Sequence, residues 1–88
     1  MAYQILILPS AGRELAALPR QAQRRIQAKI DSLAEDPHPA GAAALQGRRG
    51  YLRLRVGDYR VIYRVAKEAL EVLVIRVGHR RDTYRRMR

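Results

Sequence analysis

The sequence predicts a small α+β domain in which an antiparallel sheet of about four strands packs on an N-terminal helical hairpin. Two segments with helical spacing of apolar residues follow a short apolar run. Three segments of strand character come after them, and a two-residue turn signal joins two of these strands. A chain of 88 residues supports a single core, so we expect one domain over residues 1–88.

The N-terminal part supplies one strand and both helices. Residues 3–8 (YQILIL) are a short apolar run before Pro9, which is typical of a buried strand. The short first helix has apolar positions Ala11, Leu15 and Leu18, with Arg13 and Glu14 on its outer side. The second helix begins at Pro19 and ends at Asp36, with an apolar face of Ala22, Ile26, Ile30 and Leu33 and an outward face of Arg20, Arg24, Arg25 and Lys29. This outward face is typical of a solvated surface, and contact with nucleic acid or a partner is the alternative.

The rest of the chain supplies the remaining strands. Residues 36–50 contain two Pro and three Gly without a sustained period, so we expect a loop there. Residues 51–56 and 59–65 each alternate around Gly57 and Asp58, which are the signal of a two-residue type II′ hairpin turn. Residues 70–77 (LEVLVIRV) are almost continuously apolar, which predicts a central strand covered on both faces.

The expected register of this hairpin separates two faces of the sheet. A two-residue turn places Val56 opposite Tyr59 and Arg55 opposite Arg60. The face toward the helices then carries Leu52, Leu54, Val56, Tyr59, Val61 and Tyr63. The other face carries Arg53, Arg55, Arg60 and Arg64, with Ile62 among them. Directly opposed like charges destabilise a strand pair by up to about 1 kcal/mol, and a bound anion would reverse that effect. We therefore predict a phosphate-binding face; four arginines simply extended into water are the alternative.

The formal net charge of +10 is concentrated in the second half of the chain. Residues 1–47 carry a net charge of +1, whereas residues 48–88 carry +9. Of the 18 basic residues 16 are Arg, whose planar guanidinium group suits bidentate contact with phosphate. A high genomic GC content or a need for solubility would explain the ratio of Arg to Lys, but it would not explain this asymmetry. The charge pattern predicts a polyanionic partner.

The residue types available restrict the chemistry. The absence of Cys excludes disulfides and thiolate sites, and two distant histidines, His38 and His79, do not suggest a metal site, so we expect neither metal nor cofactor. Metal-free cleavage of RNA remains open, because the 2′-hydroxyl can attack while Arg stabilises the phosphorane charge and His or Tyr moves protons. His79, Arg80 and Tyr84 form a suitable cluster beside the basic face. Alternatively, His79 is structural and Tyr84 anchors the tail.

Two segments carry a family resemblance. Residues 52–63 (LRLRVGDYRVIY), followed by residues 77–80 (VGHR) and Tyr84, resemble the RelE/ParE superfamily of bacterial and archaeal toxins. The resemblance covers the whole chain and implies a microbial RNase-like fold and an acidic RelB-like antitoxin as partner. In the RelE-like branch it implies a ribosome-dependent mRNA endonuclease, or mRNA interferase. Such an enzyme inhibits translation by cleaving mRNA in the ribosomal A site, without metal, through a 2′,3′-cyclic phosphate.

The resemblance also assigns roles to individual residues. Arg53 matches a basic position of the RelE active site, Arg60 matches the arginine that grips the scissile phosphate, and Arg80 and Tyr84 match the last arginine and the C-terminal tyrosine. His79 stands where several relatives carry a His that can act as the acid. The flanking residues expected to bind RNA are Arg55, Arg64, Arg81 and Arg85. Tyr51 replaces a lysine of the family pattern and Gln46 stands near the place of a glutamate base, so the general base stays open.

Three functions fit this pattern. The first is the endoribonuclease, which the set of Arg60, His79, Arg80 and Tyr84 favours. The second is inhibition of DNA gyrase in the manner of ParE, and the third is an inactive module that only binds its antitoxin. The N-terminus lacks a signal-peptide pattern and no apolar run reaches the length of a bilayer span, so we expect a cytoplasmic protein with no membrane association.

Overall fold

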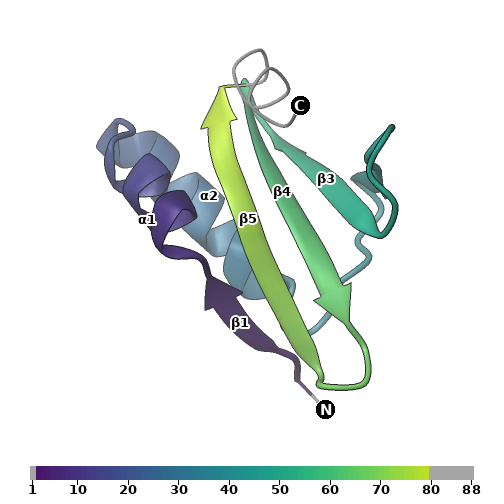
Figure 1. Cartoon of the computed structure of the whole chain (residues 1–88). Helices are drawn as coiled ribbons and strands as arrows, with labels where there is room; N and C mark the ends of the chain where they lie inside the picture. Colours follow the sequence, from purple (N-terminus) through teal and green to yellow (C-terminus); the bar gives the residue numbers. More distant parts are fainter. Residues whose placement is uncertain (1, 80–88) are drawn as a thin grey trace.

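The computed structural model describes residues 2–79, which form a five-stranded sheet and two helices. Figure 1 shows how these elements are arranged. The elements in chain order are β1 (Gln4–Ile7), α1 (Pro9–Ala16), α2 (Arg20–Ser32), β2 (Ala42–Ala44), β3 (Tyr51–Val56), β4 (Tyr59–Ala66) and β5 (Glu71–His79). The strand order is β1-β5-β4-β3-β2. Helix α2 crosses behind the sheet in Figure 1, and α1 lies beside β5 where β1 ends. The α+β class and the helical hairpin are therefore confirmed.

The sheet differs from the expected one in two respects. Strand β1 pairs with β5 in parallel, from Gln4 opposite Glu71 to Ile7 opposite Val74, so the sheet is mixed and not purely antiparallel. A fifth strand, β2, lies in the predicted loop and pairs its three alanines with residues 52–54. β2 was not predicted because alanine has a low strand propensity. The parallel pairing of β1 was not predicted because the apolar content of residues 3–8 does not encode the direction in which they pair.

The β3–β4 hairpin has the predicted register. Val56 is paired with Tyr59, Arg55 with Arg60 and Leu54 with Val61. Gly57 has φ of +61° and Asp58 is outside the left-handed region, as a type II′ turn requires. The face predicted to cover the helices does so, because Leu54, Val56, Val61 and Tyr63 are buried and Leu52 and Tyr59 pack against the same cluster.

The core lies between this face and the apolar faces of the helices. Ile26, Ile30 and Leu33 of the second helical segment are fully buried, and Ala11 and Leu15 supply the contribution of α1. The hydroxyl of fully buried Tyr63 donates a hydrogen bond to the carbonyl oxygen of Pro37 at 2.8 Å, which ties the loop after α2 to the sheet. Burial, and to a lesser extent the negative charge of Asp36, raises the pKa of Tyr63 to about 12.

Glu14 does not lie on the outer side of its helix as expected. Its carboxylate accepts hydrogen bonds from Nε and Nη2 of Arg76 at 3.1 and 2.8 Å, and from the backbone N–H of Val77 at 2.9 Å. β1 pairs with β5 only as far as Ile7, and α1 lies beside the rest of β5. The backbone N–H of Val77 on this strand edge has no strand partner there, and it donates its hydrogen bond to Glu14 instead. We call this arrangement the Glu14 latch.

In the described part of the chain no helix is long and apolar enough to span a membrane.

Candidate functional site

Four arginines lie on the sheet face that points away from the helices. We call Arg53 and Arg55 on β3 and Arg60 and Arg64 on β4 the arginine face. Arg55 and Arg60 are directly opposed in the register, and Arg53 and Arg64 flank this pair along the two strands. The period of two residues along each strand places all four on one side, as predicted. The hairpin thus brings together four of the sequence-predicted site residues.

The arginines of this face differ in burial. Arg55 and Arg64 are exposed, whereas Arg53 and Arg60 are half-buried and the Nε atom of Arg60 is buried. Arg60 is therefore more enclosed than Arg55 and Arg64. Ile62 lies between Arg53 and Arg76 in the register and is 0% exposed, so the face has an apolar floor. A guanidinium group above such a floor is less screened than one extended into water.

The electrostatics of this face favour an anion. Strands β3 and β4 contain no Asp or Glu. Arg53 and Arg64 make no ion pair with any described residue, and Arg55 donates its Nε–H to the carbonyl oxygen of Gly57 at 3.0 Å. Since Arg55 and Arg60 face each other directly, a phosphate that bridges them would turn their repulsion into attraction. Chemically, this face can bind and neutralise a phosphodiester group.

The end of β5 lies next to this face. Gly78 is paired with Arg60, and because Gly78 has no side chain, β5 places nothing beside Arg60 on that side. His79 is paired with Tyr59, and the two rings meet edge to face with centroids 6.1 Å apart and an interplanar angle of 79°. Directly opposed residues project to the same side, so the exposed His79 shares the side of Tyr59 at the end of the sheet. The structure does not place His79 over the arginine face.

The other predicted site residues lie outside the described part of the chain. They are Arg80, Arg81, Tyr84 and Arg85. Gln46, which stands near a glutamate base in the family pattern, lies in an exposed turn after β2. Within residues 2–79 no three His, Asp or Glu side chains gather as potential metal ligands.

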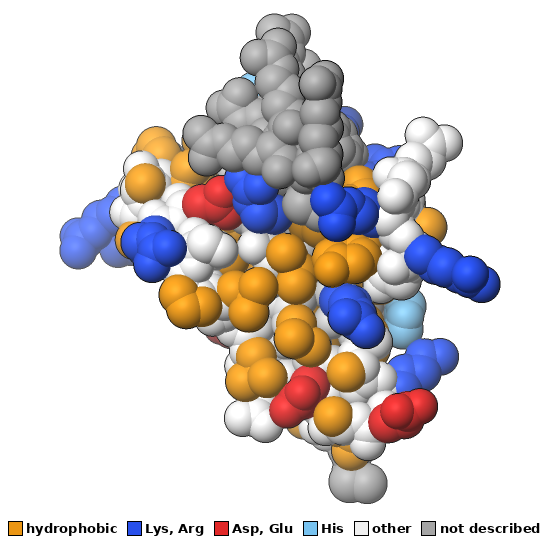
Figure 2. Space-filling model, in the orientation of Figure 1, with side chains coloured by type: hydrophobic (Ala, Val, Ile, Leu, Met, Phe, Trp, Pro, Cys, Tyr) orange, Lys and Arg blue, Asp and Glu red, His pale blue; other side chains and the backbone are white. Residues whose placement is uncertain are grey.

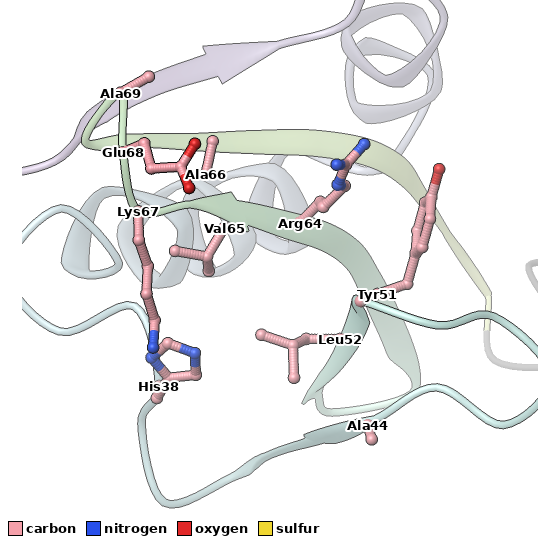
Figure 3. Close-up of a pocket in the computed structure, with 11 residues that line it drawn as sticks. His38, Ala44, Tyr51, Leu52, Arg64, Val65, Ala66, Lys67, Glu68 and Ala69 are labelled. Atoms are coloured by element: carbon pink, nitrogen blue, oxygen red, sulfur yellow. The ribbon is translucent and has the colours of Figure 1, made fainter.

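A hollow of about 550 Å³ lies at the opposite end of the sheet and was not predicted (Figure 3). Tyr51 and Arg64, an opposed pair, project to one side of the strands there, while Leu52 and Val65 project to the other (Figure 3). Lys67 from the β4–β5 turn and His38 from the loop after α2 both line this hollow (Figure 3). Sequence reasoning had no signal for this hollow, because the folded course of residues 36–50 forms one of its walls.

Comparisons with known proteins agree with this arrangement. The family model described as ParE toxin of type II toxin-antitoxin system, parDE, matches residues 5–84. The chain belongs to the RelE/ParE toxin superfamily. It is thus a toxin of the type II toxin-antitoxin class. It is 32% identical to Toxin RelG of Mycobacterium tuberculosis over 87 residues, which are 98% of this chain and 100% of the relative.

Solved RelE structures share the fold of this toxin. RelE in the RelBE2 toxin-antitoxin complex of Mycobacterium tuberculosis superposes with a TM-score of 0.79 at 28% identity, over 91% of this chain and 93% of that one. The archaeal RelE-RelB complex of Pyrococcus horikoshii OT3 also gives 0.79, at 29% identity over 91% and 97%. The family model is named after ParE and these relatives after RelE, so the comparisons establish the superfamily and the fold without dividing the two branches.

Proposed function

We propose that this toxin is a ribosome-dependent endoribonuclease of the RelE-like branch, which cleaves mRNA in the A site without a metal ion. The observation that carries the proposal is the arginine face, in which Arg55 and Arg60 oppose each other above an apolar floor. The opposed arginines destabilise the strand pair, whereas a scissile phosphate between them would be attracted by both. The RelE and RelG names of the relatives support the same branch.

The proposed reaction is a transfer within the RNA. The 2′-oxygen attacks phosphorus, a bond to the 2′-oxygen forms, the bond to the 5′-oxygen breaks, and a 2′,3′-cyclic phosphate results. Arg53 and Arg60, with Arg80, hold the non-bridging oxygens and stabilise the added negative charge. The proton for the leaving 5′-oxygen comes from His79 or Tyr84 of the predicted cluster. His79 lies at the end of β5 on the side of Tyr59, so it serves as the acid only for an RNA that passes around this end of the sheet.

The residues around the proposed reaction centre hold the RNA. Arg55 and Arg64 continue the positive surface along the two strands, and we expect Arg81 and Arg85 to extend it. Since β3 and β4 carry no carboxylate, the acceptor of the 2′-hydroxyl proton comes from outside these strands. Tyr84, or a group that the ribosome provides, is the candidate.

The partner we propose is an acidic RelB-like antitoxin in the cytoplasm. Figure 2 shows hydrophobic side chains across the middle of the open sheet face, with Lys and Arg side chains along its upper and right-hand sides. Leu6 and Leu73 are neighbours on this face, and Leu70 beside it is 37% exposed. An acidic segment with apolar anchors would cover both kinds of surface. The solved neighbours are RelE chains bound to RelB, which supports such a partner.

A cell-free translation reaction tests the proposal. We expect the toxin to truncate the message within codons in the A site, as read by primer extension, and to leave supercoiling by gyrase unchanged. Arg60→Ala and Arg80→Ala should each abolish truncation and growth inhibition, because each lost charge-assisted phosphate contact costs about 1.5–3 kcal/mol of transition-state stabilisation. Arg13→Ala is the control, since Arg13 is exposed on α1. Full toxicity of a folded Arg60→Ala variant would contradict the assignment.

Inhibition of gyrase is the second candidate function. The match to the model named after ParE favours it, as does Tyr51 in place of a lysine on the first strand of the hairpin. In that case the supercoiling reaction would stop and the message would stay intact. If both reactions proceed normally, the chain is an inactive module that binds its antitoxin.

A further inference from the structure

A second positively charged site lies outside the arginine face. A groove of about 500 Å³ runs between α2 and the end of β3, and its charged lining residues are Arg25, Lys29 and Arg55. Among the described residues, no Asp or Glu lines it. We call it the α2–turn groove. The sequence placed Arg25 and Lys29 on an outward helix surface, and the fold brings this surface against the β3–β4 turn.

The guanidinium groups of two elements converge in this groove on Gly57. Arg55 donates its Nε–H to the carbonyl oxygen of Gly57 at 3.0 Å. A Cβ atom at Gly57 would lie 3.5 Å from both terminal nitrogens of Arg25, so that guanidinium group lies directly against the turn. Lys29 follows Arg25 by four residues and therefore shares its side of α2. Three positive charges thus gather around one backbone turn.

These cations are available to a ligand. Arg25, Lys29 and Arg55 are exposed, and none of them forms an ion pair with a described residue. The hydrogen bond from Nε of Arg55 leaves its two terminal nitrogens to donate elsewhere. Asp31, an acidic residue near this end of α2, is outside the lining and accepts a hydrogen bond from Gln27. Three exposed cations that form no ion pair with a described residue make the groove a candidate binding site for an anion.

We propose that the α2–turn groove binds a backbone phosphate of RNA beyond the scissile one. This inference rests on the proposed function. Arg55 belongs both to the arginine face and to the groove, so the two sites form one continuous positive path. β2 pairs with β3 only at residues 52–54, so within residues 2–79 no strand covers this edge at Arg55 and Val56, where a strand of RNA would pass. A polynucleotide has a charge at every residue and can fill both sites at once, whereas an antitoxin would need carboxylates at matching places.

A double variant, Arg25→Ala with Lys29→Ala, tests this site. Arg13→Ala with Arg20→Ala is the matched control, because it also removes two exposed helix cations and lines no part of the groove. The probe is a ribosome programmed with a message that carries a 2′-deoxynucleotide at the scissile position. Binding is measured from about 50 to 200 mM salt, and cleavage of the normal message in single turnover.

We expect the groove variant to bind the programmed ribosome about tenfold more weakly than wild type. The slope of log K against log salt should fall by about 0.7, which corresponds to one lost phosphate contact on a single strand. The half-saturating concentration for cleavage should rise while the rate at saturation stays within about twofold, and the control variant should shift either value by less than about threefold.

Three outcomes would overturn the inference. The groove variant could match the control in affinity and salt slope. It could retain affinity for the ribosome and lose affinity for the antitoxin, which would make the groove a protein contact. Finally, wild-type toxin could fail to bind programmed ribosomes, which would overturn the proposed function as well. If wild type binds and cleaves but the groove variant is unaffected, only the groove proposal fails.

Discussion

The Glu14 latch should make a large contribution to stability from a small number of atoms. Removing the carboxylate in Glu14→Ala leaves Arg76 without its partner and the N–H of Val77 without an acceptor. The latch joins α1 to the part of β5 that β1 does not reach. We therefore expect its loss to loosen the strand end at which Gly78 is opposite Arg60 and His79 is opposite Tyr59.

The magnitude follows from the contacts. A hydrogen bond to a charged group contributes about 1.5–3 kcal/mol to the free energy of unfolding, and an orphaned N–H costs about 1 kcal/mol. The side chains of Arg76 and Glu14 are 16% and 21% exposed, so solvent screens part of the ionic contribution. We expect Glu14→Ala to cost about 2–4 kcal/mol. Glu14→Gln keeps an acceptor for Val77 and should cost about 1–2 kcal/mol.

Thermal and urea unfolding followed by circular dichroism will measure these costs. In a domain of this size each kcal/mol lowers the melting temperature by about 4–8 °C, so Glu14→Ala should melt about 8–32 °C lower and Glu14→Gln about half as much lower. Arg13→Ala, the exposed neighbour on α1, should melt within about 2 °C of wild type. If Glu14→Ala melts as high as Arg13→Ala, the latch makes no net contribution and the reasoning is refuted.

Other measurements test the remaining features. The pKa of Tyr63 is about 12 in the folded chain against about 10 when unfolded, so burial of the neutral phenol contributes stability that is complete below pH 10 and lost as pH rises toward 12. Tyr63→Phe should lower stability by about 1 kcal/mol at pH 7 and lose part of the steep alkaline fall of the urea midpoint, and an unchanged fall would contradict this. His79→Gln should slow single-turnover cleavage and remove its acid-side pH dependence without weakening binding, and wild-type rates from pH 5 to 8 would make His79 structural. Tyr84→Phe should impair cleavage more than ribosome binding, whereas full activity would indicate a packing role. The antitoxin complex should melt higher than the free toxin and its affinity should fall with salt; a salt-independent affinity would refute the electrostatic part.

The hairpin was predictable because its determinants are local. Gly57 and Asp58 define the turn, a two-residue turn defines the register, and the period of two residues assigns each side chain to a face. For this reason the sequence alone was sufficient to predict which arginines share one face of the hairpin. The burial of Ile62 and the enclosure of Arg60 did not follow, because they depend on neighbours from outside the hairpin.

Contacts between distant segments were not predictable from patterns. The direction of β1 against β5, the recruitment of three alanines as β2, and the α2–turn groove all depend on how the elements are placed in space. The expectation for Glu14 was wrong because helical spacing places it three residues after Ala11 and four before Leu18, at the border of the apolar face and not on the outer side. Its partners on the strand edge beside α1 were not predictable from any local rule.

A β-bulge in the β4–β5 pairing explains why the position of His79 could not be predicted. Tyr63 is paired with Val74, but Ile62 is paired with Arg76, so Ile75 is the extra residue and the alternation of β5 reverses beyond it. With a regular ladder Val77 would face Arg60 on the open side and Gly78 would face Tyr59. The bulge instead buries Val77 in the core and places Gly78 beside Arg60, and the same reversal turns His79 toward Tyr59. Since the Glu14 latch holds Arg76 and Val77 directly after the bulge, the two features together hold the register in which Gly78, and not Val77, is opposite Arg60.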